Sequence, residues 1–248
     1  MRLVERDYEI IGFLRDQGWV LGYQLADKFF SSRQAGSNRL RLLARAGVVE
    51  WIELNRFREK YWHERAILSV IGDLDGRNRV YRLSEEFAGS VGRRWQRSAS
   101  DFMVAHQVLL SRVRERLESE FPSCQITVEP SESLKLSLDG EVRAVPDIVA
   151  EMKGIRLAVE LERKARRGLG KRNGAYDDRF QNLAANYDAV LYVIEKEEQF
   201  SQLAKRAQGL RRVGFSSILN LNEVFRCDRQ IVTLARFVEE FVALGGHI

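Results

Sequence analysis

Three carboxylates and a lysine lie at the ends of the apolar stretch "AVPDIVAEMKGIRLAVELERK", away from its central Lys153-Gly154, and the stretch runs from Ala144 to Lys164. They are Asp147, Glu160, Glu162 and Lys164. Carboxylates that lie close together repel one another unless a positive charge stands between them. Magnesium and manganese ions favour oxygen donors of this kind, completed by water and phosphate oxygens. The stretch therefore predicts a site for Mg²⁺ or Mn²⁺, with Lys164 bringing a positive charge to a phosphate or to an attacking water.

A β-hairpin would bring these side chains together. If Lys153-Gly154 is a two-residue turn, Asp147 lies directly opposite Glu160, at a Cβ separation of about 4.5–5.5 Å. Strand alternation then puts Glu160, Glu162 and Lys164 on one side. An ordinary solvent-exposed strand face would show the same charges, so this alternative stays open. The same turn pairs apolar residues on the opposite face: Met152 with Ile155, Ala150 with Leu157, and Ile148 with Val159.

The elements around the hairpin predict an α/β domain over residues 99–248, with a mixed central sheet and helices on both faces. A long amphipathic helix is expected from Asp101 to Phe121. The other expected elements are strands in "CQITVEP" and "LKLSLDG", a helix in "AYDDRFQNLAANY", a buried strand in "AVLYVIE", a helix in "EEQFSQLAKRAQGL", a strand in "FSSILNL" and a helix in "RQIVTLARFVEEFVAL". A basic loop beside the hairpin is expected to contact DNA through Arg166, Arg167, Lys171 and Arg172.

Residues 1–98 predict a separate winged-helix DNA-binding domain, with three helices followed by two strands. Residues 1–100 hold 18 Lys and Arg against 13 Asp and Glu, so the whole net charge of +5 lies there. A basic excess of this kind is typical of a surface that meets a polyanion. The third helix is expected to enter the major groove, where Arg and Asn suit base edges. The candidate DNA contacts are Arg33, Asn38, Arg39, Arg41 and Arg45, although a solvated helix face would look the same.

Pro146-Asp147, followed by Glu160-Leu-Glu162-Arg-Lys164, resembles the active-site hairpin of the PD-(D/E)XK nucleases, which have the restriction-endonuclease-like α/β/α fold. The larger pattern resembles the replication-relaxation family and the MobC-type plasmid relaxases. It joins a winged helix to "HQVLLSRVRERL", the hairpin and "NYDAVLYVIE". The resemblance implies a metal-dependent endonuclease that nicks one strand at a plasmid transfer origin. It also implies a relaxosome accessory protein and a coupling protein as partners.

The resemblance adds His106 to the catalytic candidates Asp147, Glu160, Glu162 and Lys164, and two motif frames fit. Either Glu160 and Glu162 fill the last two positions of the motif, or Glu162 and Lys164 do. A buried or capping role for His106 stays open. Tyr176 is a candidate nucleophile, although a core or surface tyrosine would fit equally well.

Two other functions compete with the relaxase. One is a non-catalytic accessory or replication-regulating protein that only binds DNA, and the other is a site-specific repair or defence endonuclease. The first ten residues carry charges where a secretion signal needs an apolar core, so a cytoplasmic protein without membrane insertion is expected.

Overall fold

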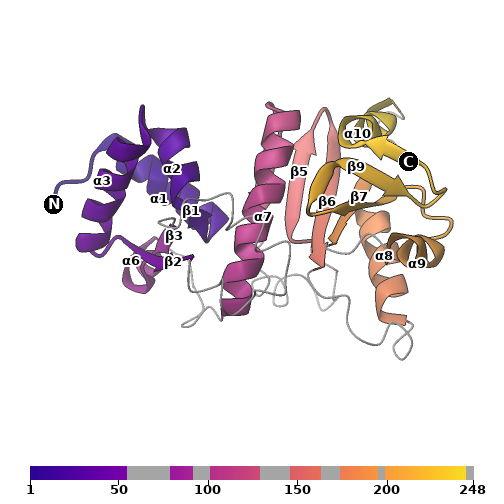
Figure 1. Ribbon diagram of the computed structural model, residues 1–248, viewed down its shortest axis with the longest axis horizontal. Helices are drawn as coiled ribbons and strands as arrows, with labels where there is room; N and C mark the ends of the chain where they lie inside the picture. Colours follow the sequence, from indigo (N-terminus) through magenta and orange to yellow (C-terminus); the bar gives the residue numbers. More distant parts are fainter. Residues whose placement is uncertain (55–78, 92–100, 129–145, 163–173, 195–198, 244–248) are drawn as a thin grey trace. The chain divides into compact units, whose positions relative to one another are not determined.

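The computed structural model describes residues 1–54, 79–91, 101–128, 146–162, 174–194 and 199–243 (Figure 1). The chain divides into two compact units, Met1–Arg112 and Val113–Ile248. Helix α7, Asp101–Glu120, crosses this division and so belongs in part to each unit. The junction predicted at residues 98 and 99 lies outside the described residues.

The N-terminal unit contains the three helices that the apolar spacing predicted, followed by strands of an antiparallel sheet. The strand order is β1-β3-β2. The third helix begins after Ser32, whose side chain accepts a hydrogen bond from the Ala35 N–H at 3.2 Å. The elements are α1 (Glu5–Gln17), β1 (Val20–Leu21), α2 (Gly22–Phe29), α3 (Arg33–Arg45), β2 (Val49–Glu53), β3 (Arg79–Leu83) and α6 (Glu85–Ser90).

The core of this unit lies between the three helices and the sheet, where Ile10, Leu14, Leu25 and Leu43 are buried. Helices α2 and α3 approach each other closely at Gly36, where an added Cβ would lie 2.7 Å from the Ala26 Cβ. A larger side chain at this position would force the two helices apart.

The C-terminal unit is built on a seven-stranded sheet of order β10-β9-β8-β7-β6-β5-β4. Strands β6, β7 and β8 are parallel to one another and the other pairs are antiparallel, so the predicted mixed sheet is confirmed. Besides α7, the elements are β4 (Gln125–Val128), β5 (Ile148–Met152), β6 (Ile155–Glu162), α8 (Gly174–Asn186), β7 (Ala189–Ile194), α9 (Phe200–Arg206), β8 (Val213–Ser217), β9 (Asn220–Arg226), β10 (Ile231–Thr233) and α10 (Leu234–Ala243).

Helices cover both faces of this sheet, as predicted. Gly214 on β8 faces Phe237 of α10, whose ring would lie 3.0 Å from an added Cβ. The next residue, Phe215, packs with Phe180 of α8 at a ring-centroid distance of 6.0 Å. Because neighbouring residues of a strand point to opposite faces, α8 and α10 lie on opposite sides of the sheet (Figure 1).

Three expected elements differ from those found. The expected strand "FSSILNL" is the end of β8 and the start of β9, which pair antiparallel after a turn in which the Leu219 N–H donates to Ser217 Oγ. The first residues of the expected last helix form β10 instead, and α10 begins only at Leu234. The helix begins there because the Thr233 hydroxyl caps it by accepting a hydrogen bond from the Arg236 N–H. The segment "RVYRLSEEF" ends as a strand at Leu83, since Ser84 caps α6. The expected strand "LKLSLDG" lies outside the described residues.

Within the described ranges, no helix has the length and apolar character needed to cross a membrane.

Candidate functional site

The carboxylates are positioned by the hairpin of β5 and β6. Lys153 and Gly154 form its turn with φ of 49° and 83°, the left-handed conformation that a two-residue type I′ turn requires. The register pairs Ile148 with Val159, as the sequence predicted. Asp147 directly precedes β5, so the same register sets it opposite Glu160.

A main-chain group holds Asp147 against the neighbouring strand. The Leu161 N–H donates a hydrogen bond to Asp147 Oδ2 at 2.8 Å. This contact holds the Asp147 carboxylate beside β6 at the level of Glu160, and its partner is a main-chain group. Asp147 and Glu162 are both half-buried, so the carboxylate cluster is partly open to solvent.

Glu160 is the buried member of the cluster, with 8% of its surface exposed. Its partner is Arg179 of α8, whose Nη2 donates to Glu160 Oε1 in an ion pair. The Arg179 side chain is 39% exposed and that of Glu160 is 10% exposed, so the cation is the more accessible partner. Arg179 was not among the residues predicted for the site, although it lies within the expected helix "AYDDRFQNLAANY".

Tyr192 lies beside Glu160 on the adjacent parallel strand, because the β6–β7 register pairs these two residues. Tyr192 is 2% exposed, and its ring packs edge-on against Phe180 of α8 at 4.6 Å. Glu160 Oε2 and Tyr192 Oη are both buried, and neither has a hydrogen-bond partner among the residues that the structure describes. Buried polar atoms without a partner are usually met by a further polar group, a water molecule or an ion.

Among the described residues, negative charge outweighs positive charge around Glu160. Burial raises the pKa of Glu160 to about 8, and the negative charge of Asp147 adds to the increase. Arg179 lowers this pKa only in part, while Glu162 raises it slightly. Burial likewise raises the pKa of the Tyr192 hydroxyl. When ionised, Asp147, Glu160 and Glu162 carry three negative charges and Arg179 returns one, so a divalent cation would complete the balance.

The donor chemistry fits a hard divalent cation. Mg²⁺ is typically held by one or two carboxylates, with water and phosphate oxygens completing its shell. Asp147 and Glu160 supply two carboxylates at one level of adjacent strands, and Glu160 Oε2 is buried without a partner among the described residues. No cluster of three or more His, Cys, Asp or Glu suited to a metal occurs in the described part of the chain. An ion at this site would therefore be coordinated by few of the described side chains.

Several predicted site residues are not joined to this cluster by the structure. Lys164 and the basic-loop residues Arg166, Arg167, Lys171 and Arg172 lie outside the described residues. Tyr176 is on α8, but its side chain is not described. His106 is half-buried on α7 in the part assigned to the N-terminal unit, and its catalytic role stays a prediction.

On the third helix of the N-terminal unit, Arg39 is engaged inside the unit. It forms an ion pair with Asp7 of α1, whose side chain is fully buried, and also donates to the Arg2 carbonyl at 3.3 Å. The hydrogen bond from Arg39 lowers the pKa of Asp7, although burial opposes this effect. Arg39 was expected to contact DNA, but here it neutralises a buried carboxylate and ties α3 to α1. The expectation placed it with the exposed arginines because a sequence does not show which helix partner lies opposite.

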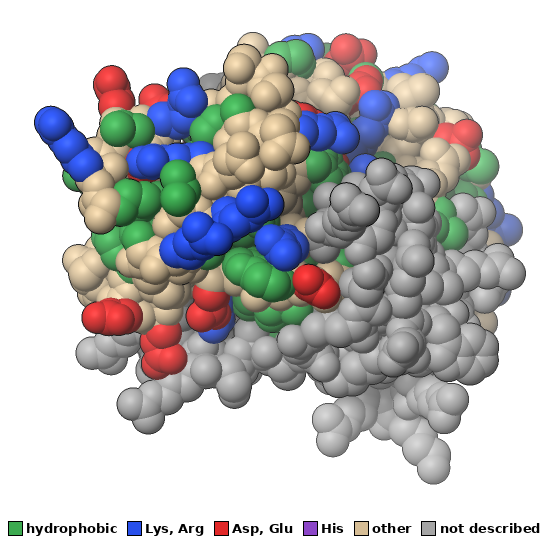
Figure 2. Space-filling model, turned by 60° about the vertical axis from the view of Figure 1, so that its left-hand side comes forward, with side chains coloured by type: hydrophobic (Ala, Val, Ile, Leu, Met, Phe, Trp, Pro, Cys, Tyr) green, Lys and Arg blue, Asp and Glu red, His purple; other side chains and the backbone are tan. Residues whose placement is uncertain are grey.

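The other candidate DNA contacts on α3 are exposed. Arg33 pairs with Asp27 at 2.7 Å, and Asn38 accepts a hydrogen bond from Gln34 at 3.1 Å. Arg41 and Arg45 extend the basic surface along the same helix. Figure 2 turns the N-terminal unit forward and shows Lys and Arg side chains gathered near its centre, next to hydrophobic ones.

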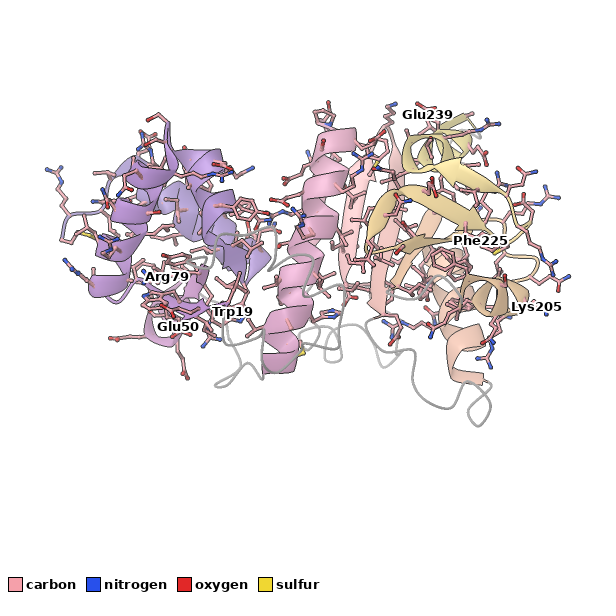
Figure 3. All side chains as sticks on the ribbon, viewed as in Figure 1. Trp19, Glu50, Arg79, Lys205, Phe225 and Glu239 are labelled. Carbon is pink, nitrogen blue, oxygen red and sulfur yellow. The ribbon has the colours of Figure 1, made fainter. Side chains whose placement is uncertain are left out.

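A second group of arginines stacks on tryptophans at the three-stranded sheet. The Arg79 guanidinium lies 3.8 Å from the Trp51 ring centroid, and Trp51 is 39% exposed. Arg82 lies over Trp19 and pairs with Glu50. Figure 3 labels Trp19, Glu50 and Arg79, which lie close together in the N-terminal unit. Cations held on aromatic faces in this way fix the sheet surface next to α3.

Comparison of the chain with family models, with curated proteins and with solved structures finds no match.

Proposed function

We propose that this protein is a divalent-metal-dependent endonuclease that binds DNA through its N-terminal unit and nicks one strand. One observation carries the catalytic part. Glu160 is buried beside Asp147, and its pKa is raised to about 8 although Arg179 is bound to it. Arg179 does not fully neutralise Asp147 and Glu160, and a carboxylate pair of this kind is suited to a divalent cation.

The N-terminal unit supports DNA as the substrate. Three helices followed by antiparallel strands is the element order of a winged helix-turn-helix, which places its third helix in the major groove. Arg41 and Arg45 are exposed on that helix, and the chain's excess of positive charge lies in residues 1–100. The finer assignment, a relaxase acting at a plasmid transfer origin, rests on the sequence resemblance.

In this proposal each described residue has a definite task. Asp147 and Glu160 hold the cation, and the Leu161 N–H keeps the Asp147 carboxylate in place. Bound Mg²⁺ or Mn²⁺ would stabilise the negative charge that develops on the phosphate during strand cleavage. Glu162 lies on the same face of β6 and adds negative charge that favours cation binding. Lys164 is proposed to bring its charge to the phosphate.

The test is nicking of a supercoiled plasmid that carries a transfer origin, with and without Mg²⁺ or Mn²⁺. Wild type should convert it to the open circle only with the cation, and Asp147→Asn should not. Glu151→Gln is the matched control, because Glu151 is on the same hairpin with an exposed side chain that pairs with Arg156 at 3.6 Å. This control should nick like wild type. Equal nicking by wild type and Asp147→Asn would refute the proposal.

A non-catalytic DNA-binding protein is the second candidate, and the Arg179–Glu160 ion pair favours it. A guanidinium seated on the central carboxylate is what an inactive descendant of a metal enzyme would retain in place of its ion. This candidate predicts sequence-specific DNA binding without any nicking, in the presence or absence of divalent cations.

A further inference from the structure

The Arg179–Glu160 ion pair has an asymmetry that bears on how the site works. Glu160 lies on the central strand β6, beside Tyr192 of β7, and its side chain is 10% exposed. Arg179 reaches it from α8 through a long side chain that is 39% exposed. Of the two partners, the guanidinium is the more accessible and stands on the longer side chain.

A divalent cation and a guanidinium on the same carboxylate repel each other strongly. In a partly buried cluster these like charges repel each other more strongly than they would in water, because the effective dielectric constant is lower. Glu160 Oε1 is already bonded to Arg179. Binding of the cation by Asp147 and Glu160 therefore works against this bond.

We propose that Arg179 is an exchangeable counter-cation: it occupies Glu160 in the metal-free chain, is displaced when the divalent cation binds, and then binds a phosphate of the DNA backbone. The proposal rests on the proposed function and adds a substrate-binding residue to it. Arginine suits this second role, because its planar fork matches phosphate oxygens with paired hydrogen bonds. Its place on α8, beside the cluster, lets a single side chain serve both anions.

The test follows the chemical reactivity of Arg179 in the full-length protein at about pH 9, where Glu160 is ionised and its ion pair with Arg179 is formed. Phenylglyoxal modifies free guanidinium groups, and mass spectrometry of the digested protein reports the modification rate of each arginine. Loss of a pair worth about 1 kcal/mol corresponds to about fivefold faster modification. Addition of Ca²⁺, which takes the same oxygen donors, should accelerate modification of Arg179 by about this factor. A short duplex oligonucleotide added with Ca²⁺ should slow it again.

Two controls accompany the measurement. Arg156 lies on β6, the strand that carries Glu160. Its side chain is 52% exposed and pairs with Glu151, so its modification rate should not respond to Ca²⁺. In Glu160→Gln the ionic partner is removed, so Arg179 should react fast with or without Ca²⁺. This variant shows that the assay detects a released Arg179 even if wild type does not release it.

The outcomes separate this proposal from the proposed function. If calorimetry shows Ca²⁺ binding but the Arg179 rate is unchanged, the exchange is refuted and the metal site stands. If Arg179 is released but the oligonucleotide gives no protection, the phosphate-binding role is refuted. If neither Ca²⁺ nor Mn²⁺ binds, the proposed function itself fails.

Discussion

Glu160→Gln should change how the stability of the metal-free protein depends on pH. The pKa of Glu160 is raised from 4.5 to about 8, because burial and Asp147 disfavour its charged form. The folded state then holds a proton that the unfolded state has lost, so wild type loses stability as the pH rises from about 4.5 to about 8. A shift of this size corresponds to about 5 kcal/mol. Glutamine cannot ionise, so the variant lacks this loss.

The comparison needs a signal from the C-terminal unit, because the four tryptophans, Trp19, Trp51, Trp62 and Trp95, all lie in residues 1–98. Urea unfolding followed by far-ultraviolet circular dichroism, together with hydrogen exchange of the β7 amides, reports it. With a chelator present, the variant should gain about 4 kcal/mol relative to wild type between pH 5 and pH 9, because part of the full shift already acts below pH 5. Comparing the two pH values cancels the effect of the altered side chain on packing. If the unfolding free energies of the two proteins changed with pH in parallel, the pKa of Glu160 would not be raised by burial and by Asp147.

The remaining predictions concern two arginines of α3. Arg39→Met leaves the buried Asp7 carboxylate without its partner, so the N-terminal unit should lose about 3–5 kcal/mol of unfolding free energy, measured by urea unfolding with tryptophan fluorescence. An unfolding midpoint equal to wild type would show that the pair contributes nothing. Arg41→Ala should leave that midpoint unchanged but weaken binding to the cognate DNA by roughly 1–3 kcal/mol if the lost contact is to a base. Unchanged affinity in a fluorescence-anisotropy titration would place the DNA surface elsewhere.

Much of the fold follows from local sequence patterns. Apolar spacing predicted α1, α2 and α3, and the Lys153-Gly154 turn fixed the register of the hairpin with Asp147 opposite Glu160. These features depend on residues that are near each other in the sequence. Gly154 favours the positive φ that the second turn position requires, whereas Lys153 adopts a positive φ that is uncommon for residues other than glycine.

Features that depend on distant partners were not predictable in this way. Tyr192 lies beside Glu160 only because β6 and β7 run parallel in one register, and Arg179 reaches Glu160 only because α8 crosses that face. The exposed or buried state of Arg39 was decided by Asp7, 32 positions away. A charged residue on the inward side of an amphipathic helix, such as Arg179 next to the buried Phe180, is the sequence signal that points to a buried ionic partner.

Calorimetric titration of the metal-free protein with Mn²⁺ tests the metal site directly, by comparing wild type with Asp147→Asn and Glu151→Gln. Wild type and Glu151→Gln should each show a saturable Mn²⁺ site, and Asp147→Asn should show none, with a circular dichroism spectrum that matches wild type. If Asp147→Asn bound Mn²⁺ with the affinity of wild type, or if wild type showed no saturable binding, Asp147 and Glu160 would not form a metal site.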